Sequence, residues 1–275
     1  MPELPEVETI KNGLANKLHN KIISDAVINR PNLRTFFPDN FTENLKDKKL
    51  TAFKRRSKYL LIELDNDYIL ISHLGMSGKF TIFSDNEDYP KDKHDHVVIN
   101  FTDGSSLVYN DIRRFGLMDF VQKNELEKHK LFVNLAPEPL TQDFNTDYLY
   151  NILKNKKTNI KNAIMDSHIV VGVGNIYACE SLFKCKISPT RSCNTIKSSE
   201  ISKLIDIIKE TLKEAIASGG STLKDYRKED GTMGYFQHSF KVYGREKEKC
   251  TICSSKIERI KQQGRSTFFC PECQK

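Results

Sequence analysis

The sequence contains no apolar run long enough to cross a bilayer, and it shows no signal-peptide pattern. Its opening residues, Met-Pro-Glu-Leu-Pro-Glu-Val-Glu, are polar and acidic, which argues against export. Internal repeats and low-complexity tracts are also absent. We therefore predict a cytoplasmic protein with no membrane partner.

Size and composition indicate a globular protein of about two domains. The chain has 275 residues, of which 38% are apolar and 29% charged, enough for a substantial core. Forty-three Lys and Arg residues against 36 Asp and Glu give a formal charge of +7. This excess is compatible with nucleic-acid binding but does not establish it.

Strand patterns dominate the first part of the chain. Apolar alternation over residues 53–71, around the turn Asp65-Asn66-Asp67, predicts a hairpin, and residues 97–109 repeat the pattern around Asp103-Gly104. Several short strands of this kind predict a sandwich or barrel over roughly the first 130 residues. The segment Ala136-Pro137-Glu138-Pro139 then interrupts the pattern and is predicted to be a domain linker.

Helical patterns follow the linker. Apolar residues recur at helical spacing between Ser198-Ser199-Glu200, a candidate N-terminal cap, and Gly219-Gly220, a candidate stop. Residues 219–234 have little apolar content and are expected to form a loop.

The seven cysteines fall into two groups. Cys179, Cys185 and Cys193 are scattered and are expected to be free or buried thiols. The other four form two C-x-x-C pairs separated by 16 residues, a spacing typical of a structural zinc ribbon: Cys250, Cys253, Cys270 and Cys273. A disulfide framework is the alternative, and it fits a cytoplasmic protein poorly. Since cysteines fill all four positions, we predict one structural zinc ion and no open site for a substrate.

The N-terminus is a second candidate site. If Met1 is removed, Pro2 carries a free secondary amine with the carboxylates of Glu3 and Glu6 a few residues away. Helical spacing starts at once from Val7, so the same residues also fit a well-capped first helix. From these residues alone the two interpretations are equally good.

Basic and apolar residues in predicted turns favour a nucleic-acid interface. Lys58 precedes a strong strand and, if it opens that strand, shares the inward face of Leu60, although a solvated basic cluster explains it equally well. Met76 lies between two glycines, and Arg113 and Phe115 lie in a turn that ends at glycine. Core packing is the ordinary role of such apolar residues, but arginine beside an apolar wedge is also what proteins that kink duplex DNA insert between base steps.

Three further stretches are candidate phosphate contacts. His94-Asp95-His96 lacks a third metal ligand, so we favour a backbone phosphate contact by His94. Two glycines before Asn175 leave backbone N–H groups at a helix start, and the upstream lysines 154, 156, 157 and 161 add positive charge. Arg265 follows a glycine at the tip of the predicted cysteine hairpin, where an ordinary solvated arginine is the alternative.

Together these motifs resemble the bacterial formamidopyrimidine-DNA glycosylase family of the Fpg/Nei type. The motifs that carry the resemblance span nearly the whole chain: residues 2–8, 58–60, 73–78, 93–96, 113–116, 172–178 and 242–245, and the four paired cysteines. One departure is Ile112, where the family often has proline, a change that affects loop stiffness more than chemistry.

The resemblance implies an α+β multidomain fold. An N-terminal catalytic β-sandwich with flanking helices would occupy residues 1–133, followed by a linker at 134–147. A helix–two-turns–helix DNA-binding domain would occupy 148–236 and a zinc finger 237–275. Such a protein would be a monomer that holds double-stranded DNA containing oxidised bases, with zinc and no organic cofactor. The loop at 219–234 would close over the extruded base.

The resemblance also implies roles for individual residues. Pro2 would be the nucleophile that forms a Schiff base at C1′, Glu3 the general acid or base, and Glu6 a supporting carboxylate. Lys58 would transfer protons and bind phosphate in β-elimination, and Arg265 would contact phosphate in δ-elimination. The remaining matches are gap-filling residues and DNA contacts, the former being Met76, Arg113 and Phe115 and the latter His94, Arg113, Lys156 and Asn175.

The predicted activity is removal of oxidised purines followed by AP lyase cleavage. The sister class that acts on oxidised pyrimidines shares the terminal proline and the zinc finger, but Leu4 and the Arg113-Arg114-Phe115 turn favour the purine enzyme. A DNA-binding zinc protein without catalytic activity is the alternative from another class.

Overall fold

The structure is a computed structural model that describes residues 2–85, 89–221 and 239–275. These residues divide into two compact units, which are considered separately. The first contains residues up to 133 together with 219–221, and the second contains 134–218 and 239–275. Most of the loop expected at 219–234 lies outside the described residues. The predicted boundaries of the linker, the helix–two-turns–helix domain and the zinc finger stay predictions.

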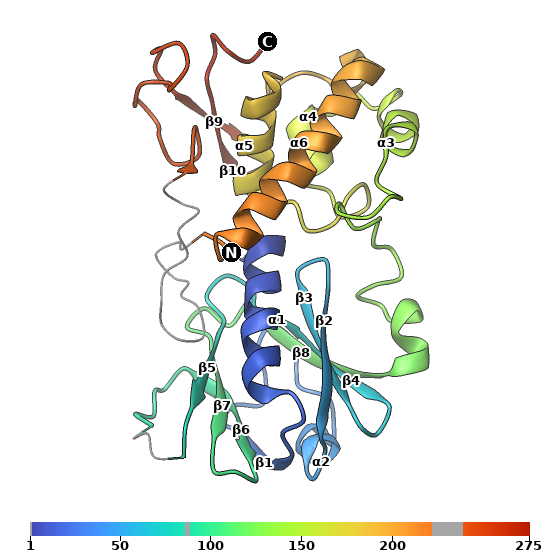
Figure 1. Cartoon of the computed structure of the whole chain (residues 1–275), viewed down its shortest axis with the longest axis vertical. Helices are drawn as coiled ribbons and strands as arrows, with labels where there is room; N and C mark the ends of the chain where they lie inside the picture. The colour runs from blue at the N-terminus through green and yellow to red at the C-terminus, as the bar shows by residue number, and fades with distance from the viewer. Residues whose placement is uncertain (1, 86–88, 222–238) are drawn as a thin grey trace. The chain divides into compact units, whose positions relative to one another are not determined.

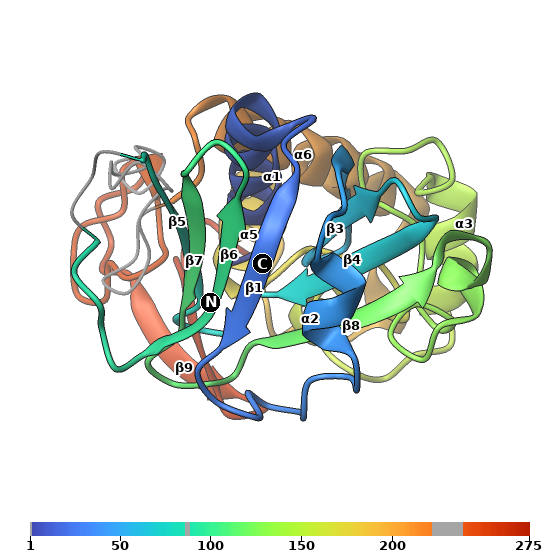
Figure 2. The same ribbon diagram turned by 90° about the horizontal axis from the view of Figure 1, so that it is seen from below.

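The first unit is built on two antiparallel four-stranded sheets, with strand orders β1-β6-β7-β5 and β2-β3-β4-β8 (Figures 1 and 2). The first sheet consists of β1 (Ile23–Ile28), β5 (Lys79–Phe83), β6 (Asp95–Phe101) and β7 (Ser106–Asn110). The second consists of β2 (Leu50–Arg56), β3 (Tyr59–Leu64), β4 (Tyr68–His73) and β8 (Leu117–Gln122). Both predicted hairpins are confirmed, as β3 pairs with β4 across Asp65–Asp67 and β6 with β7 across Asp103–Gly104.

Helix α1 (Leu4–Leu18) packs against β2 and β3. Short helical segments α2 (Phe41–Leu45) and η1 (Lys123–Lys128) complete the unit. Both sheets and α1 contribute to one apolar core, which includes Ile10 and Leu14 from the helix, Ile62 from one sheet and Ile99 from the other. A shared core between two sheets is the defining property of a β-sandwich, so the predicted fold class is confirmed.

The second unit is helical and carries a small hairpin. Its elements are α3 (Thr146–Leu153), α4 (Ile160–Ile164), α5 (Asn175–Cys185), η2 (Cys193–Thr195), α6 (Ser198–Ala217), β9 (Glu258–Gln262) and β10 (Arg265–Phe269). Helix α6 buries the predicted apolar face, including Ile201, Leu204 and Leu212. Its cap differs from the prediction, because Ser198 is already helical and Lys197 is the capping residue. The Glu200 carboxylate in the first turn accepts the Lys197 N–H at 2.9 Å, which is the glutamate half of a capping box.

No helix within the described parts of the chain is long and apolar enough to cross a membrane.

Candidate active site and nucleic-acid interface

The N-terminus of the first unit is held by buried carboxylates. Pro2 is buried directly before α1, where Glu3 is the capping residue. Glu6 Oε2 accepts the Glu3 N–H at 2.8 Å, and Glu6 Oε1 accepts both the N–H and the hydroxyl of Ser221, at 2.8 and 2.9 Å. The two interpretations of this stretch are therefore compatible, because Pro2 is buried and the capping bonds order the residue that directly follows it.

An ion pair links this helix to the strand before Lys58. Arg55 Nε donates to Glu8 Oε2 at 2.7 Å, and Arg55 Nη1 donates to the carbonyl oxygen of Ser57 at 3.0 Å. Burial opposes ionisation of Glu8, but the hydrogen bonds from Lys11 and Arg55 outweigh it and lower the pKa of that carboxyl. Sequence reasoning missed this pair, although Glu8 belongs to the acidic opening run.

Lys58 does not open a strand, which corrects the prediction. Strand β3 begins at Tyr59, and Lys58 lies in the two-residue turn after β2, where Ser57 has a φ of 56°. The Lys58 side chain is half-buried. Side chains alternate between the two faces of a sheet only within a strand. Because Lys58 lies in the turn, its side chain need not point to the same face as Leu60.

His73, at the end of β4, is a further residue near Lys58, and the sequence analysis assigned no role to it. Burial, with Lys58 and Arg34 adding positive charge, lowers the pKa of His73 to about 4. Its Nδ1 accepts the Gly75 N–H at 3.0 Å, which requires a ring without a proton at that atom. The backbone N–H of Arg34 donates to the Gly116 carbonyl at 3.0 Å, and this bond holds the loop that carries Arg34.

The three predicted gap-filling residues lie on two loops of this unit. Met76, between β4 and β5, is partly buried, whereas Arg113 and Phe115, between β7 and β8, are exposed. The Arg113 guanidinium lies 4.9 Å from the centre of the Phe115 ring, within cation–π range. Ile112 beside them is 61% exposed, so replacement of proline there leaves the core untouched.

The segment around His94 separates into one accessible and two structural residues. Asp95 is buried and accepts hydrogen bonds from Tyr89, Asn110 and the backbone of Asp92, and buried His96 bonds the Asp111 carbonyl at 2.9 Å. His94 is the partly exposed member. This partition favours a surface contact by His94 over a metal pair.

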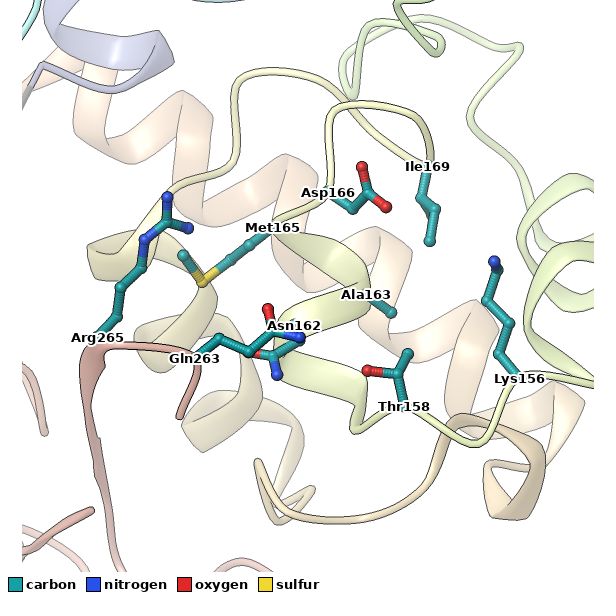
Figure 3. A pocket seen from close by; sticks show the side chains of 9 residues that line it. All are labelled: Lys156, Thr158, Asn162, Ala163, Met165, Asp166, Ile169, Gln263 and Arg265. Carbon is teal, nitrogen blue, oxygen red and sulfur yellow. The ribbon is translucent and has the colours of Figure 1, made fainter. Parts of the chain in front are cut away.

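In the second unit, Lys156 and Arg265 line one cavity of about 320 Å³ (Figure 3). Arg265 begins β10 directly after the turn Gln263-Gly264, so it stands at the hairpin tip as predicted. Figure 3 shows the two cationic side chains on opposite sides of the cavity, with Asp166 between them. Gly264 has a φ of +78°, a conformation that favours glycine and that lets the hairpin turn tightly before Arg265.

Lys161, one of the upstream lysines expected to add positive charge near Asn175, lies inside the protein. Its side chain is fully buried, and Nζ donates to Asn175 Oδ1 at 2.5 Å and to Thr267 Oγ1 at 2.8 Å. Asn175, the first residue of α5, also donates from Nδ2 to the Ser266 carbonyl at 2.8 Å. The lysine thus joins α4, α5 and the cysteine hairpin, and its position after Ile160 on a short helix gave no sequence signal for burial.

The four paired cysteines form a metal-binding cluster. Their Sγ atoms all lie within 4.8 Å of one another, with Cys250 and Cys273 at 3.9 Å and Cys253 and Cys270 at 3.4 Å. Tetrahedral zinc with Zn–S bonds of about 2.3 Å requires sulfur separations of roughly 3.8 Å, so the residues fit one structural zinc ion. Within the described residues this is the cluster that meets the geometric requirement for a metal.

The cysteine hairpin is packed on helix α5. Cys179 and Phe183 of that helix share an apolar cluster with Val242, Ile257 and Phe268. Buried Glu180 accepts the backbone N–H groups of residues 241, 242 and 243 at 2.8 to 3.0 Å. Burial raises the pKa of Glu180 despite these three hydrogen bonds. Sequence reasoning missed Glu180, whose partners are more than 60 residues away.

A two-sheet unit whose first helix is capped by buried carboxylates and a helical unit with a four-cysteine finger together define a class of two-domain zinc-finger proteins. Comparison with known proteins agrees along the whole chain. The model for the N-terminal domain of formamidopyrimidine-DNA glycosylase matches residues 1–118, that for its H2TH domain matches 135–227, and that for the zinc finger found in FPG and IleRS matches 247–275.

Full-length relatives give the same result. Formamidopyrimidine-DNA glycosylases of Wolbachia pipientis wMel and Ruegeria pomeroyi are 50% and 47% identical, each over 100% of both chains. The Lactococcus lactis Fpg in complex with DNA containing N7-benzyl-Fapy-dG is 36% identical, with a TM-score of 0.92 over 99% of each chain. This chain belongs to the formamidopyrimidine-DNA glycosylase family. It is a DNA glycosylase of base excision repair, with the AP lyase activity of that family.

Proposed function

We propose that this enzyme removes oxidised purines, 8-oxoguanine and formamidopyrimidines, from double-stranded DNA and then cleaves the strand by β,δ-elimination. The observation that carries the proposal is the buried Pro2 at the capped start of α1, beside the carboxylates of Glu3 and Glu6. Solved relatives from Lactococcus lactis were crystallised with DNA containing Fapy-dG or an abasic site, and one MutM relative with carbocyclic 8-oxo-G.

Pro2 acts as the nucleophile once Met1 has been removed. A terminal α-amine has a pKa near 7.7–8.0, against about 10.4 for lysine, so a usable fraction is neutral at pH 7. The amine forms a bond to C1′ while the bond from C1′ to the base breaks, and the base leaves with a proton. Opening of the sugar ring gives an iminium at C1′, which acidifies the C2′ proton. Loss of that proton expels the 3′-phosphate, and a second elimination expels the 5′-phosphate.

Glu3 and Lys58 move the protons. Glu3 is 3% exposed, and a carboxyl placed beside the sugar can protonate the ring oxygen as the ring opens. Lys58, on the hairpin that packs against α1, binds phosphate and assists β-elimination. Arg265 contacts a phosphate from the zinc finger and assists δ-elimination. Glu6 supports the reaction by holding the Glu3 backbone.

Met76, Arg113 and Phe115 fill the space that the extruded base leaves. Extrusion costs a few kcal/mol, which an inserted apolar wedge and DNA bending offset. The remaining DNA contacts are His94, Lys156 and Asn175. Because both ends of the Asn175 side chain are hydrogen-bonded within the protein, its backbone N–H at the start of α5 is the group offered to phosphate.

The four cysteines hold zinc, which supplies folding energy to the hairpin that presents Arg265. We propose further that the enzyme works as a monomer in the cytoplasm.

Borohydride trapping tests the activity. The protein, with removal of Met1 confirmed by mass, is incubated with duplex DNA containing 8-oxoguanine, and a covalent adduct at Pro2 is expected. If no adduct forms, the remaining interpretation is a DNA-binding zinc protein without catalytic activity. An adduct on thymine glycol but not on 8-oxoguanine would identify an oxidised-pyrimidine enzyme instead.

A further inference from the structure

The residues proposed to fill the gap lie on two separate loops of the first unit. Residues 74–78 connect β4 to β5 and carry Met76, and residues 111–116 connect β7 to β8 and carry Arg113 and Phe115. Insertion into DNA requires both loops to keep a fixed relation to each other, because a misplacement of 1 Å can cost about a hundredfold in rate.

The side chain of Asp111 connects the two loops. It is 0% exposed, and its Oδ1 accepts the Ser77 hydroxyl at 2.5 Å from the other loop. Its Oδ2 accepts the Gly116 N–H at 2.9 Å, at the far end of its own loop. One carboxylate therefore joins the Met76 loop to both ends of the loop that carries Arg113 and Phe115.

Ser77 provides a second connection between the same loops. While its hydroxyl donates to Asp111, its oxygen accepts the Arg113 N–H at 2.9 Å. The backbone of Arg113 is thus held by a residue adjacent to Met76. The Asp111 backbone is fixed as well, since its N–H donates to the His94 carbonyl at 3.0 Å and its carbonyl bonds His96 Nε2 at 2.9 Å.

The backbones of the two loops are in direct contact beneath these hydrogen bonds. A Cβ atom added to Gly75 would lie 2.3 Å from the carbonyl carbon of Phe115, and Gly75 has a φ of +62°. A Cβ atom on Gly116 would lie 1.9 Å from the hydroxyl oxygen of Tyr109. Neither site has room for a Cβ atom, and at Gly75 the two loops are packed backbone against backbone.

We propose that Asp111 is a positioning residue that holds the Met76 loop and the Arg113–Phe115 loop together as one wedge for base extrusion. The inference rests on the gap-filling role in the proposed function. Asp111 itself touches no reacting atom. The buried Asp111 carboxylate accepts hydrogen bonds from a hydroxyl and a backbone N–H, and only a group that accepts at both oxygens satisfies both donors.

The test uses Asp111→Asn, which keeps the size of the side chain but turns one acceptor into a donor. Asp103→Asn is the matched control, because Asp103 lies before β7 as Asp111 lies after it, and its partners are Lys21 and Ser105 rather than the wedge loops. We expect Asp111→Asn to slow base release in single turnover by at least about tenfold. The control should stay within about twofold of the unsubstituted enzyme.

A direct readout of insertion uses 2-aminopurine placed opposite a tetrahydrofuran abasic-site analogue. Its fluorescence change on binding the unsubstituted enzyme reports filling of the gap, and Asp111→Asn should reduce that change at saturating protein. A loss of fold alone would lower the fraction of competent protein, not the signal at saturation.

The decisive measurement combines Asp111→Asn with Phe115→Ala. If Asp111 acts through the wedge, the second substitution adds little to the loss caused by the first. If the rate losses of the two single variants multiply in the double variant, the inference is overturned. It is also overturned if Asp111→Asn releases the base as fast as the unsubstituted enzyme. Should Asp111→Asn fail to fold, Ser77→Ala replaces it in the same cycle with a smaller loss expected. Failure of the unsubstituted enzyme on 8-oxoguanine would instead refute the proposed function.

Discussion

Glu6 and Asp111 are buried carboxylates that accept hydrogen bonds from segments far apart in the sequence. Glu6 joins the start of α1 to Ser221, and Asp111 joins two loops of the sandwich. Burying a carboxylate is costly unless its oxygens are hydrogen-bonded, so each of these residues strongly favours the one arrangement that satisfies it. At the scale of single residues, these carboxylates hold the start of α1, next to Pro2, and the two loops that carry the proposed gap-filling residues.

The identity of the nucleophile is tested by Pro2→Gly. Since the proposed role of Pro2 is covalent, the substitution should leave DNA affinity largely unchanged while base release and strand cleavage slow by at least about tenfold. Binding is measured on tetrahydrofuran-containing duplex and turnover on 8-oxoguanine duplex. Unchanged turnover would mean that another amine forms the Schiff base.

His73 should make the free energy of unfolding depend on pH. Unfolded histidine has a pKa near 6.5, but the folded His73 has a pKa of about 4, so between these values the unfolded chain binds the extra proton. Stability is therefore fully present above pH 6.5 and falls as the pH drops towards 4, by as much as roughly 3 kcal/mol. Thermal unfolding at several pH values should show a shallower decline for His73→Gln. An identical decline in both proteins would show that His73 does not titrate in this way.

At the scale of elements, a few polar side chains connect pieces that have little apolar surface of their own. Arg55 ties α1 to the turn before Lys58, and Lys161 ties the short helix α4 to α5 and the cysteine hairpin. Glu180 fixes the segment that enters the hairpin to α5. The hairpin strands themselves are five residues each, too short to be stable in isolation.

Replacing a zinc ligand should therefore affect an element rather than one residue. Cys270 is buried among apolar side chains, and Cys270→Ser should abolish stoichiometric zinc and weaken DNA binding because the hairpin no longer presents Arg265. Zinc is measured by metal analysis and DNA affinity by titration. Cys185→Ser is the control, since burial raises the pKa of that thiol to about 12 and it lies outside the cluster. Retention of both zinc and affinity by Cys270→Ser would refute the metal assignment.

At the scale of the whole molecule, proposed DNA contacts occur on both units. His94, Arg113 and Lys58 belong to the first, and Lys156, Asn175 and Arg265 to the second. Such a division predicts that affinity depends on both units and is strongly sensitive to salt, because phosphate contacts release counterions from DNA.

Salt dependence separates contacting lysines from structural ones. Lys156→Ala should reduce the slope of log K against log salt by about 0.9, as expected for one lost phosphate contact. Lys161→Ala should leave that slope unchanged but destabilise the fold by at least about 2 kcal/mol, since it removes a buried hydrogen-bonded group. Lys213→Ala, on an exposed part of α6, is the control for both measurements. Equal slopes for Lys156→Ala and Lys213→Ala would exclude Lys156 as a phosphate contact.

Much of the fold was predictable from local patterns in the sequence. Alternation and turn residues predicted the hairpins β3–β4 and β6–β7, helical spacing predicted α1 and α6, and the paired cysteines predicted the metal cluster. These features depend on residues close together in the chain, where period, turn chemistry and ligand spacing are directly visible.

The sequence by itself determined the family, the metal ligands and the residue types available for catalysis. Only the tertiary structure decided that Lys58 lies in a turn, that Lys161 is internal and that Asp111 joins two loops. The bonds of Lys161 to Thr267 and of Asp111 to Ser77 span 106 and 34 residues. Burial and hydrogen bonding of a polar side chain depend on such distant partners, and no local period records which segment will pack against it.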